Sequence, residues 1–429
     1  MATLNQTPGA DRIQIAFFGR RNAGKSSLVN AVTGQEMSIV SEIKGTTTDP
    51  VTKSMEILPL GPVVIIDTPG LDDEGTVGEM RVRKARQVLN RADIAVLVAD
   101  ITRGLTGMEE ELITLFQKKR VPYLIVYNKK DLAGEDPSCR KVLKENEIAV
   151  SALKRENIEQ LKEKIGSLAE KMGEEKQIVG DLLKKGDHVI LVTPIDSSAP
   201  KGRMILPQVK VIRDILDVHG TLSVTQTEEL PALLSSLKEK PKLVITDSQA
   251  FGCVKQMVPE EIPLTSFSIL FARYKGVLAG AVQGAASIEG LREGDRILIS
   301  EGCTHHRQCE DIGTVKLPAW IEKYTGKKFV YEFTSGGGFP EDLSGYALVV
   351  HCGGCMLNER EVRSRERMAA ESSVPFTNYG ILIAYMNGIL KRSLQPFPEL
   401  AELAGKLWGT DDGSGDSRIP VKSTQTETI

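Results

Sequence analysis

A glycine-rich motif near the start of the chain constrains the fold more than any other feature. Gly19-Arg-Arg-Asn-Ala-Gly24-Lys25-Ser26 has the form G-x-x-x-x-G-K-[ST]. An apolar run, 13–18, precedes it and a helix-like segment, 27–31, follows it, which is the strand–loop–helix context that a phosphate-binding loop needs. The glycines let backbone N–H groups wrap phosphate oxygens, and the lysine reaches the β- and γ-phosphates. The motif therefore predicts a nucleoside triphosphate site.

A second motif, Asp67-Thr-Pro-Gly70, ends the apolar run 63–66. The Asp67 carboxylate and the Ser26 hydroxyl are oxygen ligands of the kind that Mg²⁺ prefers. The Gly70 N–H is placed to contact the γ-phosphate. We therefore expect both motifs to meet around a Mg–nucleotide complex.

Two further motifs select the base. Asn128-Lys129-Lys130-Asp131 ends the run 123–127, and Ser151-Ala152 follows later. The Asp131 carboxylate can accept hydrogen bonds from guanine N1–H and from the exocyclic amine, an arrangement that adenine does not offer. Asn128 and Lys129 would brace the base, and the Ser151-Ala152 loop would reach the base oxygen. The series predicts GTP rather than ATP.

The stretch between the first two motifs, Gly45-Thr46-Thr47-Thr48-Asp49, resembles switch I of the TrmE–Era-like GTPases. The resemblance implies that Thr47 binds Mg²⁺ in the GTP state. Leu71 follows the Asp-x-x-Gly motif and cannot orient water as a glutamine would. Members with an asparagine at the position of Asn22 use K⁺ beside the phosphates, which implies hydrolysis of GTP to GDP that K⁺ stimulates.

These motifs define the expected nucleotide site. The expected catalytic residues are Lys25, Thr47, Asp67 and Gly70. The expected nucleotide-binding residues are Gly19, Asn22, Ala23, Gly24, Lys25, Ser26, Ser27, Asn128, Lys129, Asp131, Ser151 and Ala152. The expected cation ligands are Ser26, Thr47 and Asp67 for Mg²⁺ and Asn22 for K⁺.

The order of apolar and charged segments predicts an α/β protein. Continuous apolar runs separated by helical stretches suit a mostly parallel sheet with helices on both faces. We expect a P-loop GTPase domain over 1–172, a middle α/β domain over 173–262, a third α/β domain over 263–408 and a flexible tail over 409–429. Residues 267–287 read as one helix, and no internal repeat is expected.

Composition limits the partners. The 429 residues carry a net charge of −3, so no global basic field points to nucleic acid. The N-terminal residues 1–11 have no apolar signal segment. Arg273 and Lys275 interrupt 267–288, the most apolar stretch, so we expect no membrane span. The chain is expected to be cytoplasmic.

Cysteine and histidine residues gather in the C-terminal part as C-x-H … H-C-x-x-C. The residues are Cys303, His305, His351, Cys352 and Cys355. Three thiolates suit a [4Fe–4S] cluster with one open iron, and they equally suit zinc with a histidine as fourth ligand. A redox-active Cys352–Cys355 pair is a third interpretation, and the spacing does not decide among them.

Other polar residues lie beside this pattern. His306 and Cys309 are candidate competing ligands. A run of arginines interleaved with glutamates follows the cysteine pair and is expected to form a solvated helix face; it consists of Arg360, Arg363, Arg365 and Arg367.

A GTPase of this type, joined to a middle α/β region and this C-terminal pattern, resembles the HydF family of [FeFe]-hydrogenase maturation scaffolds. The resemblance covers nearly the whole chain except the tail. It implies a three-domain homodimer in which the middle domain, 173–262, is the dimerisation domain. It also implies that the third domain, 263–408, binds a [4Fe–4S] cluster on Cys303, Cys352 and Cys355. The fourth position would be open or weakly held by His305 or His351.

The same resemblance implies a carrier. The protein would receive a CO- and CN⁻-ligated diiron precursor from radical-SAM maturases and deliver it to apo-[FeFe]-hydrogenase in H-cluster maturation. The main alternative is a zinc-stabilised regulatory GTPase in RNA modification or ribosome assembly. Iron and sulfide content separates these two hypotheses.

Overall fold

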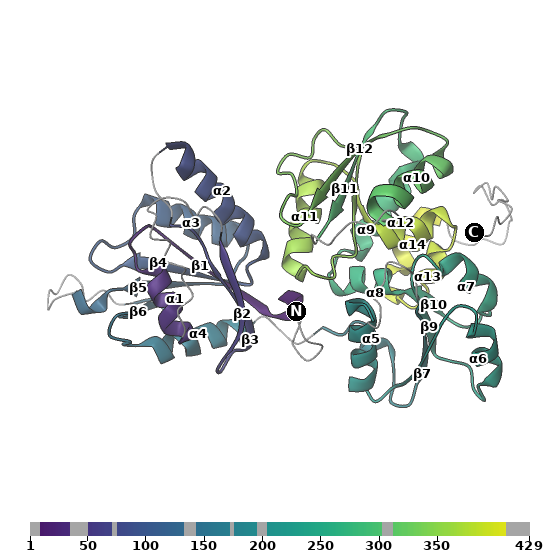
Figure 1. Ribbon diagram of the computed structural model, residues 1–429, viewed down its shortest axis with the longest axis horizontal. Helices are drawn as coiled ribbons and strands as arrows, with labels where there is room; N and C mark the ends of the chain where they lie inside the picture. Colours follow the sequence, from purple (N-terminus) through teal and green to yellow (C-terminus); the bar gives the residue numbers. More distant parts are fainter. Residues whose placement is uncertain are drawn as a thin grey trace. The chain divides into compact units, whose positions relative to one another are not determined.

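The computed structural model describes residues 9–34, 50–70, 75–132, 143–171, 176–194, 204–302 and 312–408. These residues form three sheets, each flanked by helices (Figure 1). The chain divides into two compact units. One consists of Met1–Glu175 with Met356–Ser364, and the other of Lys176–Cys355 with Arg365–Ile429. The predicted α/β fold class is confirmed.

The first unit contains a six-stranded sheet in the order β2-β3-β1-β4-β5-β6. All neighbouring pairs are parallel except β2 and β3. The strands are β1 (Ile13–Gly19), β2 (Val51–Ile57), β3 (Gly61–Asp67), β4 (Ile94–Asp100), β5 (Tyr123–Asn128) and β6 (Glu147–Ala149). The helices are α1 (Lys25–Thr33), α2 (Gly75–Arg91), α3 (Gly107–Lys118) and α4 (Ile158–Glu170), with short 3₁₀ turns at Gly9–Asp11 and Lys130–Leu132.

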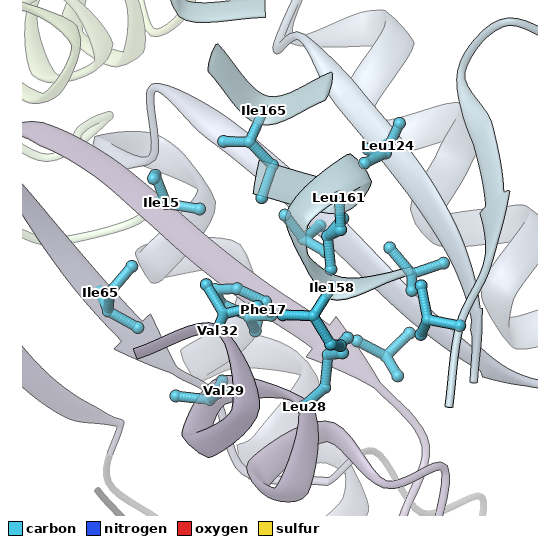
Figure 2. Close-up of a cluster of buried hydrophobic side chains, with 14 of the residues drawn as sticks. Ile15, Phe17, Leu28, Val29, Val32, Ile65, Leu124, Ile158, Leu161 and Ile165 are labelled. Carbon is cyan, nitrogen blue, oxygen red and sulfur yellow. The ribbon is translucent and has the colours of Figure 1, made fainter. Parts of the chain in front are cut away.

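Both faces of this sheet are buried. Along β1, Ile15 and Phe17 belong to one apolar cluster, whereas Ala16 and Phe18 belong to the other. Figure 2 shows the first cluster, in which side chains of α1 and α4 pack on the sheet. Strand side chains alternate between faces, so a strand buried on both sides is apolar at most positions rather than at every second one. This is why the apolar runs of the sequence are continuous.

The second unit contains two four-stranded parallel sheets. The second sheet has the order β10-β9-β7-β8 and the third β12-β11-β13-β14. Their strands are β7 (His188–Val192), β8 (Thr221–Thr225), β9 (Leu243–Thr246), β10 (Leu264–Ser266), β11 (Arg296–Glu301), β12 (Val330–Ser335), β13 (Leu348–His351) and β14 (Phe376–Asn378). Because β10 pairs with β9, the second sheet runs past the boundary expected after residue 262.

The helices over residues 204–408 are α5 (Leu206–Asp217), α6 (Leu230–Ser236), α7 (Phe251–Met257), α8 (Phe267–Tyr274), α9 (Leu278–Ala286), α10 (Leu317–Thr325), α11 (Glu359–Glu371), α12 (Tyr379–Met386), α13 (Leu390–Ser393) and α14 (Ala401–Trp408). Short helical turns lie at Gly180–Leu182, Ser287–Gly290, Ile312–Lys316 and Pro398–Leu400, of which the third is a π-helix.

The prediction of one helix over 267–287 is wrong. The segment forms two helices, α8 and α9, because Gly276 adopts a left-handed φ of 69° between them. Glycine takes this conformation without steric cost and commonly ends helices. Within the described ranges, no helix is long and apolar enough to cross a lipid bilayer.

Leu161→Ala should destabilise the first unit by about 2–5 kcal/mol, because Leu161 is fully buried in the α4 cluster and truncation leaves a cavity. The matched control is Leu153→Ala, since Leu153 is 84% exposed. Its effect should stay within about 0.5 kcal/mol. Urea unfolding of the full chain measures both, and equal midpoint shifts would contradict this packing.

Candidate functional site

The phosphate-binding loop is shaped by glycines that tolerate close backbone approach. Gly24 precedes α1 with a φ of 83°, and its carbonyl accepts the Leu28 N–H at 2.9 Å. A Cβ at Gly24 would lie 2.3 Å from Asn128 Nδ2, and one at Gly19 would lie 2.3 Å from the Val98 carbonyl oxygen. Any larger residue would therefore displace the loop from its neighbours.

Asp67 brings together the two predicted phosphate motifs. Its Oδ1 lies 2.9 Å from Lys25 Nζ, and its Oδ2 accepts the Ser26 hydroxyl at 2.8 Å. Asp67 Oδ1 is buried and has no hydrogen-bond partner among the described residues besides this ion pair. A carboxylate oxygen with spare acceptor capacity beside a hydroxyl fits a hard cation such as Mg²⁺.

Asn128 joins the base-contacting loops to the phosphate loop. Its Nδ2 donates to the Ala23 and Gly24 carbonyls at 3.2 and 3.3 Å. Its Oδ1 accepts the Ala152 N–H at 3.0 Å. Asn128 is 2% exposed, so these bonds are shielded from water. One side chain therefore fixes three loops that come from distant parts of the sequence.

The other predicted guanine residues lie beside Asn128. Lys129 has a φ of 66°, and its Nζ lies 2.6 Å from Asp100 Oδ2. The Ser151 hydroxyl donates to Asp131 Oδ1 at 2.5 Å. Ser151 is fully buried, which holds the Asp131 carboxylate in one orientation. The structure thus brings together residues of the four motifs that predict a nucleotide site.

The remaining predicted residues fall into two groups. Gly70 lies against the phosphate loop, since a Cβ there would be 2.9 Å from Arg21 Cα. Asn22 has a φ of 64° and is exposed. Thr47 and Leu71 lie outside the described residues, so the roles proposed for them stay predictions.

The cysteine pair follows the carboxyl end of β13. The Cys352 N–H donates to the Ser300 carbonyl at 2.9 Å, which continues the pairing of β13 with β11. Cys352 Sγ accepts the Gly302 N–H at 3.0 Å and the Gly354 N–H at 3.4 Å. Two backbone N–H groups therefore point at the Cys352 sulfur.

The rest of the predicted cluster site is only partly placed. Cys352 and Cys355 are half-buried thiols. The predicted partners Cys303 and His305, with the neighbouring His306 and Cys309, lie outside the described residues. Across the described ranges no group of three or more His, Cys, Asp or Glu residues could hold a metal ion.

His351 is engaged within the protein at both ring nitrogens. Nδ1 lies 2.7 Å from the Cys352 carbonyl, to which it donates, and Nε2 accepts from Arg365 Nη1 at 3.0 Å. Burial and the adjacent guanidinium lower the pKa of His351 to about 3, so the ring is neutral at neutral pH. Both ring nitrogens of His351 are therefore engaged in contacts within the protein.

Arg365 is the residue that the sequence interpretation misplaced. It was expected on a solvated face, yet it is 3% exposed and donates from Nη2 to the Gly336 carbonyl at 2.6 Å. Its guanidinium also lies over the Phe339 ring, 5.2 Å from the centroid. The buried residues Val362 and Ala369 lie three positions before and four positions after it, and this helical spacing was the available signal.

The first sheet and its loops define the class: this chain contains a P-loop GTPase domain. The family model described as 50S ribosome-binding GTPase matches residues 14–129. Two further models match the second unit, the hydrogen maturase F dimerization domain over 178–276 and the hydrogen maturase F tetramerization domain over 279–396. These two together match just over half of the chain, and the chain belongs to the HydF family.

Two curated GTPases each match less than half of this chain. GTPase Der of Kosmotoga olearia is 38% identical over 130 residues, which is 29% of each chain. The tRNA modification GTPase MnmE of Nitrosomonas europaea is 33% identical over 170 residues, 39% of this chain and 37% of MnmE. The chain thus spans about a third of the length of these curated relatives. The solved structure of Era from Aquifex aeolicus is 21% identical, with a TM-score of 0.34, and covers 52% of this chain and 97% of Era.

Gly24→Ala should weaken GDP and GTP binding at least about tenfold, because the new Cβ would collide with the Asn128 amide. Gly34→Ala is the matched control. Gly34 also has a positive φ, 66°, but no atom lies within 4 Å of its Cβ position. The control should lose stability without losing nucleotide affinity. Titration with a fluorescent guanine nucleotide checks this, and equal affinity losses would refute the role of the Gly24 contact.

Proposed function

We propose that this chain is a GTP-hydrolysing iron–sulfur scaffold that carries a diiron precursor during maturation of [FeFe]-hydrogenase. The observation that carries the proposal is the combination, in one HydF chain, of converging GTPase motifs with a C-x-x-C loop in which Cys352 Sγ accepts two backbone N–H groups. Each part alone fits other functions. The GTP site also suits the alternative of a zinc-stabilised regulatory GTPase.

The nucleotide chemistry follows from the assembled loops. Lys25 would neutralise charge on the β- and γ-phosphates, and Ser26 with Asp67 would hold Mg²⁺. Thr47 would join them when GTP is bound. Asp131, oriented by Ser151, would read the guanine edge. Mg²⁺, when bound, supplies charge stabilisation at the transferring phosphoryl group.

We expect GTP turnover to be several-fold faster in K⁺ than in Na⁺. Leu71 cannot orient water, so a cation beside the phosphates would supply the missing transition-state stabilisation. Asn22→Gly should remove the K⁺ advantage, because it deletes the candidate ligand while glycine accepts the φ of 64°. Steady-state hydrolysis in matched KCl and NaCl measures this, and equal rates in the unaltered chain would count against a K⁺ site.

The C-x-x-C loop would contribute two of the three thiolates that a [4Fe–4S] cluster needs. Cys352 and Cys355 offer two half-buried thiols on one tight loop, and Cys303 would be the third ligand. Gly354, with a φ of 64°, permits the loop to present its N–H to Cys352 Sγ. When bound through three cysteines, such a cluster supplies one iron with an exchangeable ligand. A carrier needs such a bond to take up and release its cargo.

The partners follow from the family. The dimerization and tetramerization models support self-association, and we propose a homodimer formed through the middle domain. Radical-SAM maturases would supply the CO- and CN⁻-ligated diiron unit, and apo-[FeFe]-hydrogenase would receive it. We place this exchange in the cytoplasm, without nucleic acid or membrane partners.

Elemental analysis of anaerobically purified protein tests the cluster. We expect about four irons and matching acid-labile sulfide per chain, with loss of most of both in Cys352→Ser. The control is Cys253→Ser. Cys253 is an exposed thiol on α7, which follows β9 of the second sheet, whereas the C-x-x-C loop follows a strand of the third sheet. It should retain the full iron and sulfide content.

The competing outcome is equally clear. One zinc per chain without sulfide, lost in Cys352→Ser, would refute the scaffold and support the zinc-stabilised GTPase. GTP hydrolysis would survive in that case, since the nucleotide site lies in the other unit.

A further inference from the structure

The second and third sheets are built on one plan. In each, the first strand lies between the second and third strands, and the fourth strand pairs with the third. The registers also agree. Leu191 pairs with Ile245 as Ile299 pairs with Val350, and Thr265 and Thr377 continue these two rows. We name residues 184–286 the first module and residues 292–394 the second module.

The two modules share sequence where their last strand meets the following helix. Between residues 263–278 and 375–390, seven of sixteen aligned positions are identical without a gap. Ser266 and Asn378 cap the helices that follow by accepting the N–H of Ile269 and Ile381. Gly276 and Gly388 end those helices with φ values of 69° and 65°.

The turns that lead into the first strands agree as well. Gly186 donates to the His219 carbonyl at 3.0 Å and Gly294 to the Lys328 carbonyl at 2.8 Å. Asp187 and Asp295 each accept the backbone N–H three residues before them, at 2.8 and 2.7 Å. Agreement at both ends of a module, in residue type and in hydrogen bonding, contradicts the expectation of no internal repeat.

The modules pack on each other reciprocally. Helix α9 of the first module packs on β14 of the second, and α13 of the second packs on β10 of the first. Figure 1 shows α8, α9, α12 and α13 between the two sheets. Reciprocal contacts of this kind are the signature of a two-fold interface.

The axis of this interface can be located. Ser268 and Gly380 occupy equivalent positions, second in α8 and second in α12. A Cβ at Gly380 would lie 2.2 Å from Ser268 Cβ. Equivalent residues that contact each other lie on a two-fold axis, so a pseudo-two-fold axis passes between these two backbones.

We propose that the two modules are copies of one structural unit that bind each other as an internal dimer, and that the first module thereby holds the strand that supports the C-x-x-C loop. That strand is β14, which pairs with β13 through His351 and Asn378. The Thr377 hydroxyl donates to the Ala281 carbonyl of α9 at 2.8 Å. A Cβ at Gly284 would lie 2.0 Å from the Phe376 carbonyl oxygen, so α9 lies directly on the strand backbone.

The two halves of the interface differ in the hydrogen bonding of one threonine hydroxyl. Thr265, the counterpart of Thr377, is equally buried, but its hydroxyl has no hydrogen-bond partner within the described residues. On the opposite side, Arg392 of α13 instead donates to the carbonyls of Val258 and Pro259 at 2.9 and 2.7 Å. The equivalent threonines therefore form a matched pair in which only one bridges the modules.

Hydrogen exchange on the full chain, without nucleotide or cluster, tests the holding contact. Thr377→Val should speed amide exchange in residues 348–355 and 376–378 about fivefold, the ratio expected for one lost buried hydrogen bond. Thr265→Val should leave exchange in the equivalent residues 243–250 and 264–266 unchanged or slower. Equal effects of the two substitutions, or no effect of Thr377→Val, would overturn the proposal.

A mutant cycle across the axis tests the internal dimer. Gly380→Ala should lower the melting temperature, and Ser268→Gly in the same chain should restore most of the loss by removing the facing Cβ. The neighbouring Ser248 hydroxyl can rotate away from the new methyl group. Simple addition of the two single effects would refute the contact on the axis. Neither readout depends on GTP hydrolysis or iron, so the scaffold proposal can fail without affecting this one.

Discussion

Parallel strand pairing is the constraint on which both sites depend. Parallel strands bring their carboxyl ends to one edge of a sheet, and the loops that leave this edge meet there. In the first sheet this places Asp67 and Asn128 next to the phosphate loop. In the third sheet it places the Cys352 N–H within hydrogen-bonding distance of the Ser300 carbonyl. In each case the chemistry lies on short loops, and the buried strands beneath them fix the loop positions.

The nucleotide site was predictable because its residues lie in compact motifs directly after buried strands. Each motif specifies both a residue type and a place in the sheet, so Asp131 and Ser151 could be assigned without knowing their contact. Arg365 was not predictable from its glutamate-rich neighbours. The spacing of Val362 and Ala369 indicates that this helix position faces inward, but it does not show that Gly336 and Phe339, from an earlier part of the chain, contact the guanidinium.

The repeated module escaped sequence analysis for a different reason. Only the segments that begin at Pro263 and Pro375 keep recognisable similarity, whereas the remaining equivalence resides in strand register and backbone hydrogen bonds. Backbone pairing constrains side chains only to be apolar and of suitable size. The division of residues 267–287 into α8 and α9 was missed for a related reason. A single glycine, Gly276, does not by itself indicate a helix end, whereas the structure shows that Gly276 and Gly388 end equivalent helices.

The exchange of helices between modules changes what the connection between them has to do. The segment that joins the modules, residues 287–291, includes the exposed Glu289 and Gly290. Helix α9 packs on the sheet of the second module, and α13 packs on the sheet of the first. A backbone cut at this segment would therefore leave these packing contacts between the two pieces in place. Covalent continuity there contributes little to the arrangement of the two sheets. The joint is therefore a place where the chain can accept a nick, an inserted peptide or a new pair of termini while the surrounding structure stays assembled.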